Sequence, residues 1–97
     1  MIDLPADQLA QVRQIVKSHL PEGEVFAFGS RVSGKAKKFS DLDLMVRTGA
    51  SVPWKKLAEL RESLEDSDLP ITVDVVDWSQ CSDDFRRMVA ADLFPLA

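Results

Sequence analysis

The stretch of sequence that decides the fold is Val25-Phe26-Ala27-Phe28-Gly29-Ser30, followed after ten intervening residues by Asp41-Leu42-Asp43. The first segment is an apolar run that leads into a small turn, and the second places two carboxylates at the start of a strand. Residues two apart on a strand point to the same face, so Asp41 and Asp43 are expected to project together while Leu42 and Leu44 point the opposite way.

The paired carboxylates are suited to binding a divalent cation. Held roughly 5–6 Å apart, two such charges repel each other by about 3 kcal/mol at an effective dielectric constant of about 20. Mg²⁺ prefers hard oxygen ligands and would remove this repulsion. Glycine has no Cβ, so a polyphosphate can approach the backbone closely at Gly29. The combination predicts nucleotidyl transfer, although either fragment alone is typical of an ordinary turn or a solvated strand end.

The segment Ile71-Thr72-Val73-Asp74-Val75-Val76 predicts a third strand that adds another carboxylate. Its odd-numbered residues are apolar and are expected to face the helices, which puts Asp74 on the face that carries Asp41 and Asp43. An aspartate between valines is costly to bury unless it is paired or bound to a metal. A partly exposed structural aspartate is the alternative. Asp77 has the opposite parity and is interpreted as a turn residue.

Hydrophobic periodicity predicts helices before, between and after these strands. A first helix begins near Pro5 and ends before Pro21, a short helical turn follows Ser30, Ser51 caps a helix that extends to about residue 66, and Ser82 caps a last helix. The strands are expected at residues 24–29, 41–47 and 71–76. The positions predicted to face the core are Leu9, Val12, Val16 and Leu20 in the first helix, Trp54, Leu57, Leu60 and Leu64 in the next, and Phe85, Met88 and Val89 in the last.

The position of the motifs constrains how the strands run. Ser30 follows the first strand and Asp41 begins the second, and both must reach one phosphate–metal site, so these strands are expected to be antiparallel. Asp74 lies in the first half or middle of its strand, which predicts a third strand parallel to the second. The expected fold is α/β (α+β), a small mixed sheet of three to four strands backed by helices, in a single domain spanning residues 1–97.

Composition and charge argue against several classes of protein. The chain has 97 residues, of which 45% are hydrophobic and 29% charged, as in an ordinary soluble domain. No stretch resembles a membrane span or a signal peptide. Cys81 and His19 are each the sole residue of their type, which argues against disulfides and zinc sites. The net charge of −4 argues against direct nucleic-acid binding. A cytoplasmic protein is therefore expected.

A basic cluster lies between the turn and the acidic pair. In a protein that is acidic overall, it is well placed to meet the charge of a triphosphate, with a solvated basic loop as the alternative. Arg31 directly follows Ser30 and is the best nucleotide-binding candidate, and Lys35 is predicted to contribute with it. The cluster consists of Arg31, Lys35, Lys37 and Lys38.

Three segments together resemble the DNA polymerase β-type nucleotidyltransferase superfamily, and within it the minimal nucleotidyltransferase (MNT) group: Phe28-Gly29-Ser30-Arg31-Val32-Ser33-Gly34, Ser40-Asp41-Leu42-Asp43-Leu44 and Val73-Asp74-Val75-Val76. The resemblance covers most of the chain. It implies that Asp41, Asp43 and Asp74 are catalytic and bind metal, and that Gly29 and Ser30 hold the nucleotide's phosphates. Many MNT proteins are antitoxins paired with a HEPN-domain RNase toxin, and they transfer AMP from ATP to a tyrosine of that toxin.

What the resemblance implies for this chain is a metal-dependent nucleotidyltransferase that acts as an antitoxin. An acceptor hydroxyl would attack the α-phosphate of ATP in line, with two Mg²⁺ ions held by Asp41 and Asp43 and with Asp74 completing the site of the catalytic ion. The expected partner is a HEPN-type toxin, joined with this chain in a hetero-oligomer.

Two alternatives to a toxin-modifying enzyme remain open. The chain could be a non-catalytic antitoxin that acts by occlusion, with Met45, Thr72 and Val76 on the carboxylate face forming part of the contact. It could also be a nucleotidyltransferase that modifies a small molecule, although a chain this short leaves little with which to build an acceptor pocket.

Overall fold

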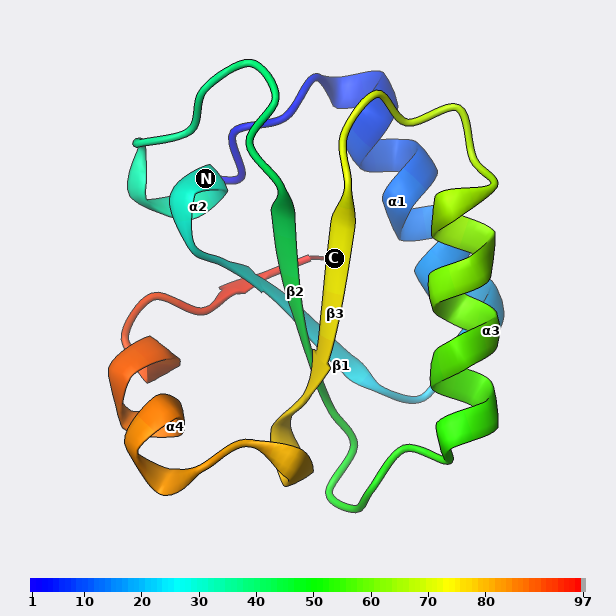
Figure 1. Ribbon diagram of the computed structural model, residues 1–97, viewed down its shortest axis with the longest axis vertical. Coiled ribbons are helices and arrows are strands. Elements are labelled where there is room, and N and C mark those ends of the chain that lie inside the picture. The colour runs from blue at the N-terminus through cyan, green and yellow to red at the C-terminus, as the bar shows by residue number, and fades with distance from the viewer. Residues whose placement is uncertain (97) are drawn as a thin grey trace.

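The computed structural model describes residues 1–96, which form a four-stranded sheet with helices on both sides (Figure 1). Among these residues, no helix has both the length and the apolar character needed to cross a membrane. The elements in chain order are α1 (Ala6–His19), β1 (Glu24–Phe28), α2 (Ser30–Ser33), β2 (Leu42–Arg47), α3 (Trp54–Glu65), β3 (Val73–Asp77), the 3₁₀ helix η1 (Trp78–Gln80), α4 (Asp83–Ala90) and β4 (Phe94–Pro95).

The strand order is β3-β2-β1-β4. β1 and β2 are antiparallel, with Phe28 opposite Asp43, and β2 and β3 are parallel, with Asp43 opposite Asp74. Both predicted strand orientations are thereby confirmed. The fourth strand is a short segment near the C-terminal end that pairs antiparallel with β1. The sequence analysis allowed for a fourth strand without locating it.

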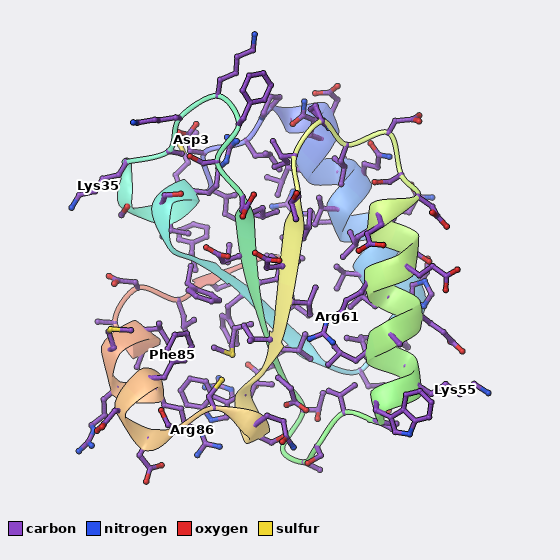
Figure 2. The ribbon with its side chains drawn as sticks, viewed as in Figure 1. Asp3, Lys35, Lys55, Arg61, Phe85 and Arg86 are labelled. Atoms are coloured by element: carbon purple, nitrogen blue, oxygen red, sulfur yellow. The ribbon has the colours of Figure 1, made fainter. Side chains whose placement is uncertain are left out.

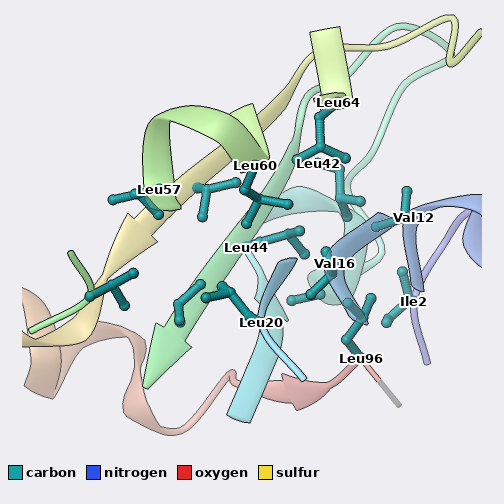
Figure 3. Close-up of a cluster of buried hydrophobic side chains, with 14 residues drawn as sticks. Ile2, Val12, Val16, Leu20, Leu42, Leu44, Leu57, Leu60, Leu64 and Leu96 are labelled. Atoms are coloured by element: carbon teal, nitrogen blue, oxygen red, sulfur yellow. The ribbon is translucent and has the colours of Figure 1, made fainter. Parts of the chain in front are cut away.

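One face of the sheet is covered by α1 and α3. Figure 1 shows these two helices together on one side of β2 and β3, and Figure 3 shows the apolar side chains that meet there. Leu44 of β2 and Leu60 of α3 are completely buried in this cluster. Burying a leucine side chain stabilises the fold by about 2 kcal/mol, so this cluster is the main source of stability. The predicted helical core positions Val12, Val16, Leu20, Leu57, Leu60 and Leu64 are all buried.

The other face of the sheet is covered in part by α4. Phe28, Met45 and Val89 form a second buried cluster there, and Phe85 packs edge-on against Phe28 with ring centroids 6.0 Å apart. Met45 has no exposed surface and Val76 packs against the same cluster. The prediction that Met45 and Val76 lie open for a partner is therefore wrong, because α4 covers this half of the face. Thr72 remains exposed.

The helix starting near residue 51 differs from the prediction. α3 begins at Trp54 after Pro53, and no side chain caps it, so Ser51 is not its cap. Proline favours a helix start because its φ angle is fixed close to the helical value. Trp54, the first residue of α3, is 80% exposed, so the prediction that it faces the core is wrong.

In α4, Ser82 caps the helix as predicted by accepting a hydrogen bond from the Phe85 N–H. Met88 is 66% exposed, whereas Val89 is buried and Phe85 half-buried. Phe85 and Val89 are four residues apart and so share one face of the helix, which turns toward the sheet and leaves Met88 outside. The prediction that Met88 faces inward is wrong.

Candidate active site

Three aspartates lie near the N-terminal ends of β2 and β3. Asp43 is the central one, flanked across the sheet by Phe28 of β1 on one side and Asp74 of β3 on the other. Asp41 immediately precedes β2 and, being two residues before Asp43, has the same parity. Asp41 and Asp74 are exposed and Asp43 is half-buried. The predicted parity places all three on the face opposite Leu42 and Leu44.

The three carboxylates act on one another electrostatically. Burial raises the pKa of the Asp43 carboxyl above its usual value, and the negative charges of Asp74 and Asp41 raise that pKa further. This environment disfavours the ionised form of Asp43. A divalent cation on this face would reverse the effect, because it would replace two repulsive interactions with attraction to one shared positive charge.

Gly29 is required by the geometry next to Asp43. Its φ of 79° and ψ of −152° lie in a region that residues with a Cβ rarely adopt. A Cβ built at this position would also lie 2.6 Å from Asp43 Oδ2, well inside van der Waals contact. The sequence analysis explained this glycine by the approach of a phosphate. In the structure the nearest group is the Asp43 carboxylate, so Gly29 brings the acidic residue directly against the turn.

Ser30 begins α2 immediately after this turn. The carbonyl oxygen of Gly29 accepts hydrogen bonds from the N–H groups of Val32 and Ser33, each at 3.0 Å, so the helix starts at the edge of the carboxylate group. Gly29 and Ser30 are therefore next to Asp43, as the motif spacing predicts. Their role in holding phosphates remains a prediction.

Arg31 has a different role from the predicted one. Its side chain is only 6% exposed, and its guanidinium donates hydrogen bonds to the carbonyl oxygens of Asp3, Lys38 and Ser40 at 2.9–3.2 Å. These bonds fix the loop that leads to Asp41 against α2 and the N-terminal segment. The prediction that Arg31 is directed at a nucleotide phosphate is wrong, because its donors are committed to backbone carbonyls.

Lys35 lies on the same loop and is exposed. Figure 2 shows its side chain extending outward, away from β2 and β3. Lys37 and Lys38 are also exposed. The structure therefore does not bring these lysines to the carboxylates, and a contribution of Lys35 to nucleotide binding stays a prediction.

Asp77 lies on the same strand as Asp74 but on the other face. It is 4% exposed, and its carboxylate accepts hydrogen bonds from the Val52 N–H at 2.9 Å, the Ser79 N–H at 3.0 Å and the Ser79 hydroxyl at 2.9 Å. It therefore fastens the end of β3 to the segment that precedes α3. The parity assigned to Asp77 is confirmed, but its interpretation as a turn residue is wrong, because it is the buried last residue of β3.

Arg61 of α3 is a further residue beside the site that the sequence analysis did not single out. Its Nη2 donates a 2.6 Å hydrogen bond to the carbonyl oxygen of Val75, and Figure 2 shows the side chain reaching from α3 toward β3. In the sequence, this contact is indicated by the position of Arg61 between Leu60 and Leu64, at the side of the apolar stripe of α3 that packs on the sheet.

The donor set fits a hard divalent cation. Three carboxylates share one face, and the raised pKa of Asp43 is what such an ion would lower. Within residues 1–96, however, no three carboxylate, imidazole or thiolate groups are gathered into a ready-made metal site. Like charges favour rotamers that separate them, so bringing the carboxylates together would require side-chain rotation around an ion rather than a change in the backbone.

Comparison with known proteins agrees with this geometry. The family described as "Polymerase beta, Nucleotidyltransferase" matches residues 10–92. A Haemophilus influenzae protein named "Probable protein adenylyltransferase MntA" is 42% identical over 88 residues, which cover 91% of this chain and 77% of the relative. Among solved structures, a protein described as a minimal nucleotidyltransferase is 27% identical, with a TM-score of 0.73 over 92% of each chain. The toxin–antitoxin MntA–HpeT is 21% identical, with a TM-score of 0.75 over 92% of this chain and 72% of that one.

Proposed function

The chain belongs to the polymerase β nucleotidyltransferase family, and from this membership we propose that it transfers AMP from ATP to a hydroxyl group of a partner protein. The observation that carries the proposal is the position of Asp43 between Asp74, its lateral neighbour on β3, and Gly29, which directly follows Phe28, its lateral neighbour on β1. It places a turn suited to phosphates on one side of the central carboxylate and a second carboxylate on the other.

Asp41, Asp43 and Asp74 are the residues that would hold Mg²⁺. When bound, the metal would supply positive charge to the pyrophosphate leaving group and lower the pKa of the acceptor hydroxyl. Asp43 is the central ligand because it is flanked by both other carboxylates, which already act on its charge. Asp74 is exposed and lies on the side of Asp43 away from β1, so it is the carboxylate that an incoming acceptor would meet, and it can accept the hydroxyl proton.

Gly29 and Ser30 would hold the β- and γ-phosphates. The backbone enters α2 at this point, and the Ser30 hydroxyl can donate to a phosphate oxygen. Arg31 supports this part of the site indirectly, because its hydrogen bonds to the carbonyls of Lys38 and Ser40 hold the loop that carries Asp41. Its contribution is therefore to position Asp41.

The proposed partner is a HEPN-type toxin, and the proposed acceptor is a tyrosine hydroxyl on it. The Haemophilus influenzae relative is named as a protein adenylyltransferase. A solved Shewanella oneidensis complex of the same fold pairs an MNT antitoxin with a tri-AMPylated HEPN toxin. These relatives support a role as the antitoxin of such a pair, assembled with the toxin as a hetero-oligomer.

The test is transfer of label from α-³²P-ATP to the proposed HEPN-type partner, in the presence of Mg²⁺. The double variant Asp41→Asn with Asp43→Asn should lose the transfer while melting no lower than the wild-type protein. The matched control is Asp83→Asn with Asp84→Asn, which removes the same charge from two exposed positions on α4, where the carboxylates pair with Arg86 and Arg87 at the surface.

Label transfer at the wild-type rate by the site variant would refute the proposed function. If the site variant transfers no label and yet neutralises the toxin fully in cells, transfer occurs but neutralisation depends on binding alone.

A further inference from the structure

We propose that the segment of the partner that carries the acceptor hydroxyl binds as an added β-strand along the outer edge of β3, beside Asp74. This inference rests on the proposed transfer reaction and specifies how its protein substrate is recognised. It follows from the direction of attack, the pairing of β3, and the two surfaces that border this edge.

The direction of attack decides on which side the acceptor must lie. In an in-line displacement, the attacking oxygen and the leaving pyrophosphate lie on opposite sides of the α-phosphate. The lateral row across the sheet runs from Phe28 through Asp43 to Asp74, and Gly29 follows Phe28 and lies against the Asp43 carboxylate. With the pyrophosphate at Gly29 and Ser30, the acceptor has to approach from the Asp74 side, which is the β3 side.

β3 is the last strand of the sheet on that side. The carbonyl oxygen of Thr72 accepts a hydrogen bond from the Leu42 N–H, so residue 72 directs its backbone groups toward β2. Backbone groups of successive residues on a strand point to alternate edges, so Val73 and Val75 direct theirs outward. Within the described residues, no strand pairs with this edge. An unpaired edge of this kind is a template for β-strand addition.

A strand added here would place one of its side chains directly beside Asp74. Strands in a sheet are about 4.8 Å apart, and laterally neighbouring residues project their side chains to the same face. The lateral row of Phe28, Asp43 and Asp74 would then continue to a residue of the partner. A hydroxyl on that side chain would reach the carboxylates without any pocket in this chain to hold it.

The two faces of the edge impose a pattern on the added segment. Its side chains would alternate between the carboxylate face and the α3 face. A cleft of ≈ 360 Å³ borders the start of β3, with apolar walls from Leu64, Leu69, Pro70, Ile71 and Val73 and polar walls from Glu65 and Thr72. The segment that fits has a hydroxyl residue on one face and apolar residues at the alternate positions, which enter this cleft.

Arg61 sets the C-terminal limit of the docking edge. It donates to the outward-facing carbonyl of Val75 and so occupies that acceptor in the free protein. A charged side chain over a strand edge is a common protection against unwanted pairing. The groups left for the partner are the N–H and carbonyl of Val73 and the N–H of Val75.

The first test removes one of these donors. Val73→Pro deletes the outward N–H without touching the hydrogen bonds to β2, and Val73→Ala is the matched control that loses the side chain but retains the N–H. With toxin as acceptor, Val73→Pro should raise the KM for toxin roughly tenfold relative to Val73→Ala, with the KM for ATP unchanged in both. Equal KM values for toxin in two folded variants would overturn the proposal.

The second test needs no variant. Amide hydrogen exchange of the wild-type chain, alone and in complex with the toxin, should show new protection at Val73 and Val75. Asp74 and Val76 should be protected in both states, because their N–H groups already face β2. Unchanged exchange at Val73 and Val75 in the complex would overturn the proposal even if Val73→Pro fails to fold.

The two measurements separate this inference from the proposed function. Protection at Val73 and Val75 without any label transfer would support edge pairing and refute the transferase. Label transfer without that protection would leave the transferase intact and refute edge pairing.

Discussion

The face of the sheet that carries Leu42 and Leu44 and the face that carries Asp41, Asp43 and Asp74 are built in opposite ways. The first is covered by α1 and α3 over a continuous apolar cluster. The second is covered by α4 only over Met45 and its neighbours. Its three carboxylates include Asp43, whose pKa is raised by burial and, to a smaller extent, by the charges of Asp74 and Asp41. The apolar face therefore stabilises the fold, whereas the carboxylate face lowers its stability because like charges are held near one another.

β3 contains this contrast in a single strand. Asp74 and Asp77 are three residues apart and lie on opposite faces. Asp74 is exposed, whereas Asp77 is buried and accepts three hydrogen bonds. The same side chain therefore has a structural role on one face and the proposed catalytic role on the other, and exchanging each aspartate for a neutral residue should separate the two roles.

The largest expected effect is on catalysis. Asp74→Asn should lower the rate of AMP transfer by roughly 10³-fold, because losing a ligand of the catalytic ion removes several kcal/mol of transition-state stabilisation. Asp77→Asn should remain within about threefold of wild type, since it lies on the other face. Initial rates at saturating ATP, corrected for the folded fraction, provide the comparison. An inactive but folded Asp77→Asn would show that the two faces have been assigned the wrong way round.

The next largest effect is on the free energy of unfolding, to which Asp77 is expected to contribute more than Asp74. Asp77→Ala should lower the free energy of unfolding by about 2–4 kcal/mol, because it leaves the Val52 and Ser79 N–H groups without their acceptor. Asp74→Ala should change it by no more than about 0.5 kcal/mol, as expected at an exposed position. Urea denaturation measures both. Equal losses in the two variants would contradict the division of roles along β3.

The smallest effect concerns Asp43 and pH. A raised pKa means that the folded protein binds this proton more tightly than the unfolded chain does, so ionised Asp43 costs stability at neutral pH. This cost in stability diminishes as the pH falls through the folded-state pKa of Asp43, and it is absent below the unfolded-state pKa. Asp43→Asn should therefore melt a few degrees above wild type near pH 7, and the gap should shrink as the pH is lowered to about 4. A variant that melts below wild type at neutral pH would mean that Asp43 stabilises the fold.

Much of the fold could be predicted from the sequence because strand alternation is a local property of the backbone. The parity of Asp43, Asp74 and Asp77 follows from it directly. The antiparallel and parallel pairings were predicted by requiring Ser30, Asp41 and Asp74 to reach one site, and the register confirms both.

The role of Arg31 could not be predicted in this way. Its guanidinium binds carbonyl oxygens of Asp3, Lys38 and Ser40. Every residue has a backbone carbonyl, so the sequence does not indicate which of them a side chain will bind. The burial of Met45 did have a signal. Leu44-Met45-Val46 is a run of three consecutive apolar residues, which is typical of a strand covered on both faces rather than one.

The central claim is that the carboxylate face acts through a metal ion, and isothermal titration with ATP tests it most directly. We expect wild-type protein to bind ATP at least about tenfold more tightly with Mg²⁺ than with a chelator, because the carboxylates repel the phosphates until a cation lies between them. The variant Asp41→Asn with Asp43→Asn should lose this difference. Equal affinity of the wild-type protein for ATP with and without Mg²⁺ would contradict the account.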